Sequence, residues 1–527
     1  MRGKTGYCPS VPNLNNQEDA LATLPHVRRG VLRFAVTLAI ITYVDRVCIS
    51  QAAPFLQEEL ALTAGQMGLA FSAFAWAYAL FEIPGGWLGD RIGPRKVLMR
   101  VVIMWSVFTA ATGYVWNLAS LIIVRFCFGM GEAGCFPNLT KAFTIWLPYH
   151  ERTRAQAVLW LSARWGGAFT PLLVIWVMSW VSWRNTFALF GSIGVVWAFV
   201  FHRSFRDRNS SNSLCAPGTL ETPPHPMPCA IELRSADLSP PPLGPGETAG
   251  GGPKSALPLA RTAPNSTAAQ PIPLPEGEGA HRAPTGVKAE NPARPLRVPW
   301  RNLLSSRSMW LLWLQYFCLT YGWYFYVTWL PTYLKETRGL ELDQNSLMLW
   351  LGNVLGELLT PETTRRVLVA ALAGLPLFFG GFGAIVCGLL TPRLVRRTGS
   401  VARTRQGIAV LGFTGAAALL VSSSYIRDPL MAMLAMGLAS FCNDLTMPGS
   451  WSTCMDVGAK YAGTLSGSMN MMGSVGAAVA PLVIGIILDS SGRNWALTFW
   501  ISGIVYLLGG LCWLWLDPVT PIEAKEA

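Results

Sequence analysis

The chain has 527 residues, of which 51% are hydrophobic and only 13% are charged. Soluble domains carry about 25% charged residues, so most of this surface is expected to face something other than water. The formal net charge of +12 would suit nucleic-acid binding if the basic residues formed one face. They instead occupy short segments between apolar runs, where positive charge sets membrane topology, and this argues against a nucleic-acid partner.

The eleven cysteines lie mostly singly within apolar runs, and the sequence has no CxxC pair or Cys/His cluster. Isolated cysteines of this kind are expected to act as small apolar residues packed between helices. No metal, disulfide framework or cofactor is therefore expected. The first 29 residues are polar and the first apolar run is long enough to span a bilayer, so no signal peptide is expected.

Twelve apolar runs approach or exceed the length of about 20 residues that a helix needs to cross a bilayer. The runs are 31–53, 67–89, 97–116, 118–139, 155–177 and 186–202, followed by 310–333, 367–390, 407–423, 430–451, 462–488 and 495–515. They predict an all-α membrane protein with about twelve transmembrane helices in two six-helix halves.

The segment between the two groups of runs is rich in Pro, Gly, Ser, Ala and Thr and is expected to be a disordered linker. A regulatory or docking role is the alternative. The predicted parts are an N-terminal tail (1–30), a first half (31–207), the linker (208–300), a second half (301–517) and a C-terminal tail (518–527). Alternate loops are basic, which places both tails in the cytoplasm and the 337–366 loop outside a multi-pass protein of the cell membrane, the inner membrane in a bacterium.

The two halves repeat. GGAFTPLLV (166–174) in the fifth run corresponds to GAAVAPLVI (476–484) in the eleventh, and GWLGDRIGPRK (86–96) after the second run corresponds to GLLTPRLVRR (388–397) after the eighth. Small residues allow close helix approach, and proline is tolerated in membrane helices where neighbours satisfy the freed carbonyl. Two parallel halves are a known transporter layout, with the binding site between them at the bilayer midplane.

The 86–96 segment resembles the signature of the major facilitator superfamily. Its matching positions are Gly86, Asp90, Arg91, Gly93, Arg95 and Lys96. The resemblance implies a gating loop that closes the cytoplasmic side, with the aspartate pairing against a neighbouring helix. The copy after the eighth run has Pro392 where the acid would stand, so a weaker contact is expected there.

Within the superfamily, the chain is similar to the anion:cation symporter family, which includes bacterial hexuronate, glucarate and galactonate transporters. The similar segments are YVDR (43–46), RFCFGMGEAGCFPN (125–138), WLPTYL (329–334) and YAGTLSGSMNMMGSVGAAVAPL (461–482). The resemblance spans nearly the whole chain except the linker. It implies that the first, fourth, seventh and tenth helices surround the cavity.

Ionisable residues within membrane helices cost about 3 kcal/mol or more each and are functional by default. They are Asp45, Arg46, Glu82, Arg125, Glu132, Arg164 and Asp444. A helix rises 1.5 Å per residue, so Asp45 and Arg46 of the first run can lie at the same depth in the membrane as Arg125 of the fourth. Glu132 follows Arg125 by two turns and is expected about 10 Å deeper. A purely structural ion pair remains an alternative for that layer, as does a structural role for Glu132 among its glycines. Glu82 is expected near the cytoplasmic end, as a loop-facing or gating residue.

These residues and the resemblance predict proton-coupled symport of a small organic anion, such as a hexuronate, aldonate or aldarate, by a monomer in the lipid bilayer. Asp45 and Glu132 are the candidate proton-coupling residues, and ionised Asp45 is expected to compete with the anion for the arginines. The candidate substrate-binding residues are Tyr43, Arg46, Tyr78, Arg125, Arg164, Tyr321, Tyr324, Asn443 and Asn470. A sodium- or potential-driven carrier and a transporter-like sensor are the alternatives. No nucleophile–base pair or cofactor loop supports an enzyme.

Overall fold

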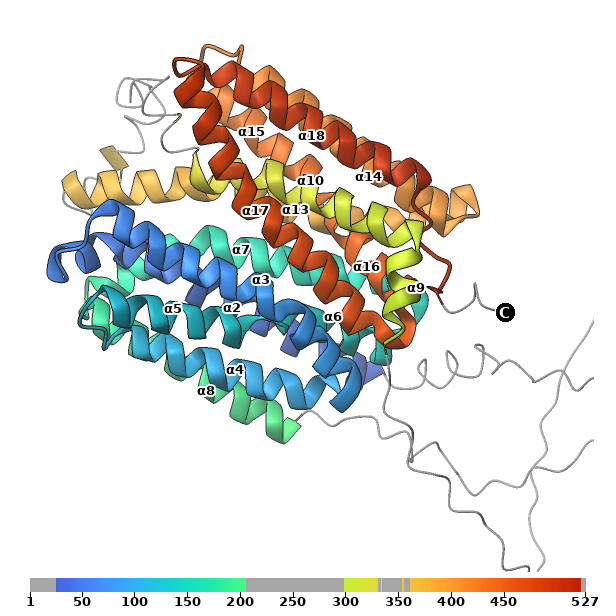
Figure 1. The fold of residues 1–527 in the computed structure, drawn as a ribbon, viewed down its shortest axis with the longest axis horizontal. Helices are drawn as coiled ribbons and strands as arrows, with labels where there is room; N and C mark the ends of the chain where they lie inside the picture. The colour runs from blue at the N-terminus through green and yellow to red at the C-terminus, as the bar shows by residue number, and fades with distance from the viewer. Residues whose placement is uncertain (1–24, 205–297, 330–332, 334–352, 355–360, 523–527) are drawn as a thin grey trace, which may run out of the picture. The chain divides into compact units, whose positions relative to one another are not determined.

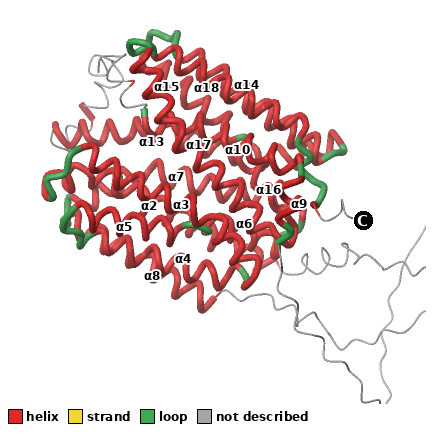
Figure 2. Tube along the Cα trace, viewed as in Figure 1, coloured by secondary structure: helices red, strands yellow, loops and turns green. Residues whose placement is uncertain are grey.

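The computed structural model describes residues 25–204, 298–329, 333, 353–354 and 361–522. Helices make up nearly all of this part of the chain, and no strand occurs within it (Figure 2). The linker expected at 208–300 and the outer loop expected at 337–366 lie mostly outside the described residues.

The first half has seven helices, in blue to green in Figure 1. They are α2 (Pro25–Glu59), α3 (Ala64–Ile92), α4 (Pro94–Thr112), α5 (Leu118–Glu132), α6 (Cys135–Trp146), α7 (Arg152–Met178) and α8 (Trp183–Ser204). Local sequence sets their ends: Thr63 and Asn117 cap α3 and α5 with reciprocal side-chain hydrogen bonds, as capping boxes do. Gly93, at φ +91°, makes the turn between α3 and α4, a conformation that favours glycine.

The second half, in yellow to red, repeats this order (Figure 1). Its helices are α9 (Trp300–Ser305), α10 (Arg307–Thr328), α13 (Pro361–Thr398), α14 (Val401–Ser423), α15 (Pro429–Asp444), α16 (Met447–Gly458), α17 (Ala462–Ser490) and α18 (Trp495–Trp515). Each of the twelve predicted runs corresponds to helix within the described residues. By length and composition alone, eight helical stretches of this part of the chain could cross a membrane.

Two runs that the sequence presents as single helices are broken. The fourth run divides into α5 and α6 at Gly134, which has φ +85°. Asn138 then donates hydrogen bonds to the carbonyls of Gly134 (2.7 Å) and Gly85 (3.0 Å) and so joins α6 to α3. The tenth run divides into α15 and α16 at 445–446. Neither break changes the apolar composition of its run, so the sequence gives no sign of it. Such breaks are tolerated within a membrane where the freed backbone groups find partners inside the protein.

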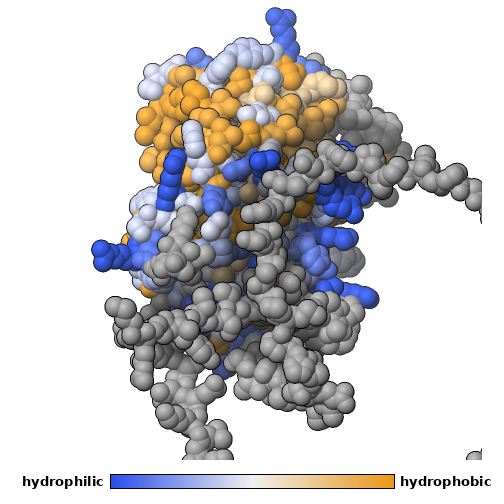
Figure 3. Space-filling model, turned by 90° about the vertical axis from the view of Figure 1, so that its right-hand side faces the viewer, coloured by the Kyte–Doolittle hydropathy of each residue, from blue (hydrophilic) through white to orange (hydrophobic). Residues whose placement is uncertain are grey.

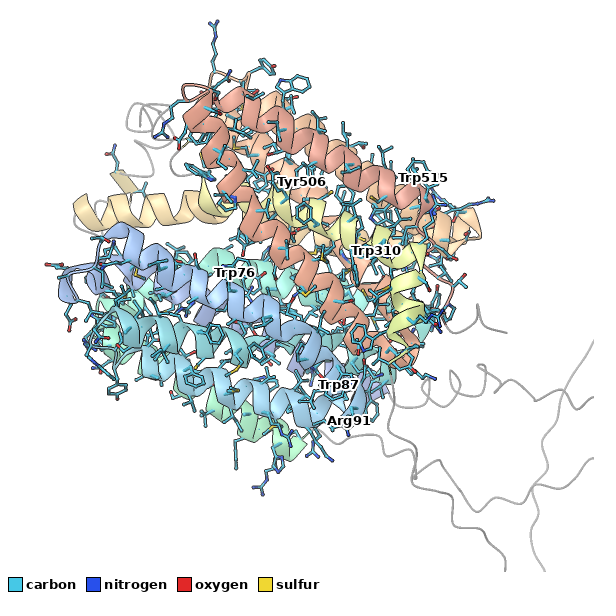
Figure 4. The ribbon with its side chains drawn as sticks, in the orientation of Figure 1. Trp76, Trp87, Arg91, Trp310, Tyr506 and Trp515 are labelled. Carbon is cyan, nitrogen blue, oxygen red and sulfur yellow. The ribbon has the colours of Figure 1, made fainter. Side chains whose placement is uncertain are left out.

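The halves meet along two helix pairs, α3 with α17 and α7 with α13. Small residues bring the backbones together: a Cβ on Gly86 would lie 2.1 Å from the carbonyl oxygen of Gly463, and one on Gly374 would lie 2.7 Å from that of Ala168. Large apolar side chains such as Trp76, labelled in Figure 4, lie exposed on the flanks. Such a surface suits contact with lipid.

An ion-pair cluster joins the halves where α7, α14 and α16 meet. The carboxylate of Asp456 on α16 accepts hydrogen bonds from Arg152 (2.7 Å) and Arg405 (2.6 Å). The side chains of Asp456 and Arg405 are each 1% exposed. Helix α13, which ends in the 388–397 repeat, contacts all three helices of this cluster.

We expect Asp456→Asn to lower the unfolding temperature of the purified protein strongly. Removing one partner of a buried ion pair costs about 3–5 kcal/mol, because the other charge stays buried without compensation. Glu151→Gln is the matched control, since Glu151 pairs with Arg28 at 3.0 Å but is 34% exposed, and exposed pairs contribute about 0–1 kcal/mol. Equal melting temperatures for the two variants would contradict the structural role of the cluster.

Candidate functional site

A cavity of about 260 Å³ lies between the halves. Its polar lining comes from both: Tyr43, Arg46, Tyr78 and Arg164 from the first half, and Tyr324 and Asn470 from the second. Aromatic rings make up much of the remainder, including Phe74, Phe136, Trp160 and Trp323. A largely apolar pocket with a few convergent polar groups is typical of a small-molecule site.

Arg46 on α2 is the cation that faces this cavity most openly. Its Nε donates a hydrogen bond to Oε1 of Glu132 at 3.0 Å, and its Nη2 pairs with the same oxygen. The Arg46 side chain is 24% exposed, whereas that of Glu132 is 1% exposed. The guanidinium also lies over the ring of Tyr78, at 4.6 Å from its centroid. A positive group thus faces the cavity while its carboxylate partner lies buried behind it.

Asp45 and Arg125 are not part of the cavity lining. Asp45 is buried, and neither of its carboxylate oxygens has a hydrogen-bond partner among the described residues. Arg125 is buried between the rings of Phe74 (5.0 Å) and Phe128 (4.6 Å). Asp45 interacts electrostatically with Arg125, whereas Glu132, and not Asp45, is the carboxylate that pairs with Arg46. Of these two neighbours on α2, Arg46 lines the cavity and Asp45 does not.

Glu82 on α3 is a site residue that sequence reasoning misplaced. It is fully buried rather than loop-facing, and the side-chain amide of Asn470 on α17 donates a hydrogen bond to its Oε1. The same amide lies 3.4 Å from the hydroxyl of Tyr78. Glu82 follows Tyr78 by four residues, so the two share one face of the helix. The four-residue spacing from Tyr78 could have indicated from the sequence that Glu82 lies one helical turn from a cavity residue.

Arg164 on α7 pairs across the halves with Asp444 on α15. Its Nε donates to Oδ2 at 2.6 Å and its Nη2 to Oδ1 at 2.9 Å. Asn443 does not line the cavity; its amide donates to the same carboxylate at 2.9 Å. Of the two tyrosines expected from α10, Tyr324 lines the cavity, whereas Tyr321 is buried against Phe317. Asn443 and Tyr321 thus lie outside the cavity lining in this structure.

The signature loop lies at the end of the helices that carries Trp87 and Arg91, called here the Asp90 end (Figure 4). Asp90 accepts hydrogen bonds from the backbone N–H groups of Gly463 (3.0 Å) and Thr464 (2.6 Å), at the start of α17 in the other half. Lys141 on α6 pairs with it at 3.0 Å. Figure 3 looks onto this end, where hydrophilic side chains project beside the hydrophobic flank.

The other signature residues divide into two groups. Gly86 allows the close approach to α17, and Gly93 makes the turn. Arg91 lies over the ring of Trp87 (5.3 Å), and Arg95 donates to the carbonyl of His202 at 2.7 Å. Lys96 is exposed on the surface. Of the six signature residues, Gly86 and Asp90 are the two whose contacts described above reach the second half.

Comparison with known proteins agrees with this architecture. Residues 35–481 match the family model of the Major Facilitator Superfamily. The chain is 31% identical over 501 residues to the probable sulfoacetate transporter SauU of Cupriavidus necator, covering 95% of this chain and 96% of that protein. It is 28% identical over 478 residues to the D-galactonate transporter of Escherichia coli, with 90% and 92% covered. The solved structure of the Escherichia coli fucose:proton symporter FucP has a TM-score of 0.58 at 13% identity, with 93% and 99% covered.

Two repeated helical halves around a cavity with a few convergent polar groups define a membrane transporter. The chain belongs to the major facilitator superfamily. This membership confirms the expected fold of about twelve transmembrane helices, and it confirms the expectation of a transporter rather than an enzyme.

We expect Asp90→Asn to leave substrate affinity nearly unchanged and to slow turnover, because Asp90 is outside the cavity but joins the halves. Replacing a charged acceptor with a neutral one weakens its hydrogen bonds by about 1 kcal/mol. Equilibrium binding and single-turnover transport on the same preparation measure the two effects. Asp428→Asn is the matched control, since Asp428 caps only its own helix, α15, and asparagine caps equally well. A loss of affinity in Asp90→Asn as large as its loss of turnover would contradict this division.

Proposed function

We propose that this protein is a proton-coupled symporter of a small organic anion of the sugar-acid type. The observation that supports it best is the Arg46–Glu132 pair, in which a cation at the cavity wall has a buried and titratable partner. Relatives named as transporters of sulfoacetate and D-galactonate support the organic anion. The tyrosine and asparagine groups in the cavity lining suit a hydroxylated substrate.

The mechanism follows from competition for Arg46. While Glu132 is ionised, its carboxylate occupies the Arg46 guanidinium and opposes an incoming anion. A proton on Glu132 removes that charge, so Arg46 becomes available and proton and anion favour each other's binding. Such coupling is reciprocal, because each ligand must raise the affinity for the other by the same factor. Asp45, buried beside this layer without a hydrogen-bond partner, is the second candidate proton carrier, and Arg125 acts behind the lining rather than on substrate.

Movement of the halves completes the cycle. In the proposed topology both tails are cytoplasmic, and the Asp90 end is the cytoplasmic end. The Asp90 and Asp456 contacts then close the cytoplasmic side in this structure, and they must separate before substrate can leave inward. Rocking of two halves around a central site is the usual movement of this layout. We propose that one monomer in the bilayer suffices, since the cavity lies between halves of a single chain.

We expect Arg46→Lys to weaken substrate binding by about tenfold or more, because lysine keeps the charge but loses the planar fork that matches a carboxylate. Calorimetric titration with the substrate measures this. Arg28→Lys is the control on the same helix, since Arg28 pairs with Glu151 on the surface. Normal affinity in Arg46→Lys would show that Arg46 is not the residue that binds the anion.

We expect Glu132→Gln to exchange labelled for unlabelled anion across proteoliposomes but to fail to accumulate it under a proton gradient. Glutamine resembles the protonated acid permanently, so loaded carriers can move both ways, whereas the empty carrier cannot release a proton before it returns. Counterflow and gradient-driven uptake in the same vesicles measure both activities. Accumulation by the variant under a pH gradient alone would eliminate Glu132 as an essential proton carrier. Wild-type accumulation driven only by sodium or by membrane potential would favour that other coupling, and absence of any accumulation would favour a sensor.

A further inference from the structure

The Arg164–Asp444 pair is built differently from a surface ion pair. Both side chains are at most 1% exposed, and two hydrogen bonds of 2.6 and 2.9 Å join them in a fork. The guanidinium carbon of Arg164 lies 4.1 Å from the ring centroid of Trp323 on α10. Arg164 nevertheless contributes to the cavity lining, together with Trp323. A second guanidinium therefore reaches the space into which Arg46 also projects.

The surroundings of Asp444 come from several elements of the second half. Gly380 on α13 leaves room for the carboxylate, since a Cβ there would lie 2.5 Å from Oδ2. Asn443 donates a hydrogen bond to Oδ1. The titratable side chains that act on Asp444 electrostatically are Tyr326 on α10 and Tyr506 on α18 (labelled in Figure 4), together with Arg164 from α7. Among these described neighbours, Arg164 is the cation.

A purely structural reason for this pair is weak on energetic grounds. Removing two charges from water often costs more than their attraction returns, and apolar residues of similar size can replace buried pairs without loss of stability. The pair also joins two halves that must move relative to one another in a transporter. A residue pair at a mobile interface, next to a cavity, is better placed to exchange partners than to fix the fold.

We propose that Arg164 is a second anion-binding site, and that the cavity takes a small organic dianion with one anionic group at Arg46 and the other at Arg164. This deepens the proposed function and rests on it. Arginine binds planar anionic groups through two parallel hydrogen bonds, the geometry now occupied by Asp444. The incoming group replaces Asp444 at Arg164, as the first anionic group replaces Glu132 at Arg46.

The space between the two arginines supports a substrate charged at both ends. Tyr43 and Tyr324 line the cavity and interact electrostatically with both Arg46 and Arg164. Each carries a hydroxyl that can donate or accept a hydrogen bond. The cavity lining therefore includes two cations and two hydroxyl groups, which suits an aldarate or a short sulfonated carboxylate better than an aldonate with one charge.

The test compares charge-matched probes on the purified full-length protein: D-glucarate with D-gluconate, and sulfoacetate with acetate. We expect the wild type to bind at least one dianion about tenfold or more tightly than its monoanionic counterpart, as a second charged contact implies. The double variant R164Q/D444N removes both charges together, so the site stays neutral and no buried charge is left unpaired. It is expected to lose that preference, so that each dianion and its monoanionic counterpart bind with affinities within about twofold of each other.

The single variant Asp444→Asn gives a readout that a structural pair would not. It leaves Arg164 charged without a competing carboxylate, so dianion affinity should rise. Equal losses of mono- and dianion binding in the double variant, together with a lower melting temperature, would show that the pair is structural and overturn the proposal. Wild-type binding of monoanions as tightly as dianions would overturn it too, while leaving organic-anion transport intact. Binding of none of the four probes by a cooperatively melting wild type would count against the proposed function itself.

Discussion

A charge inside a membrane protein must have a partner, because an unpaired ion in hydrocarbon costs several kcal/mol. Here each arginine of the cavity lining contacts one carboxylate: Arg46 contacts Glu132, and Arg164 contacts Asp444. The pairing that makes these residues tolerable also occupies the groups that could bind an anion. An external anion can reach either guanidinium only when the internal carboxylate gives way. Anion selectivity and coupling to a second ion would then both follow from the requirement that a buried charge has a partner.

The pairs differ in what they join. Arg46 and Glu132 both belong to the first half, so their contact can persist while the halves move. The Arg164–Asp444 pair, the Asp456 cluster and the Asp90 contacts all cross from one half to the other. Movement of the halves must alter these three. The structure thus separates contacts that respond to ligands from contacts that respond to the position of the halves, and Arg164 belongs to both groups.

Much of the fold could be predicted because length and hydropathy suffice to locate membrane helices. The predicted runs correspond to helices, and the repeated prolines at 171 and 481 both lie inside helices. The breaks at Gly134 and at 445–446 were missed, because a break inside an apolar run changes no composition. At the site, the costly charges were recognised, but their contacts were not. Arg46 and Glu132 form a hydrogen bond although the sequence placed Glu132 about 10 Å deeper than Arg46, and which face Asp45 and Arg125 take depends on the rotation of helices against neighbours, which one sequence does not contain.

Partner choice was also beyond the sequence. Asp444 and Arg164 were both recognisable as costly charges, yet 280 residues separate them, and no local pattern links such positions. Glu82 illustrates the same limit, because its partner Asn470 lies on a helix of the other half. Residues that act across the interface are thus the least predictable, although they are central to the proposed mechanism.

The contact of Asp90 with α17 has a further consequence. Two of the groups that meet its carboxylate are backbone N–H groups in the first turn of a helix, where aligned peptide dipoles amount to roughly half a positive charge. The hydroxyl of Thr464 adds a third donor at 2.7 Å, and a Cβ at Gly463 would lie 2.6 Å from the carbonyl oxygen of Gly86. Most substitutions elsewhere in that turn would leave the backbone donors in place, since every residue except proline supplies one. Sequence drift at the start of α17 is therefore constrained at Gly463 and Thr464, whereas the other positions of the turn are free to vary with little effect on how firmly the two halves close.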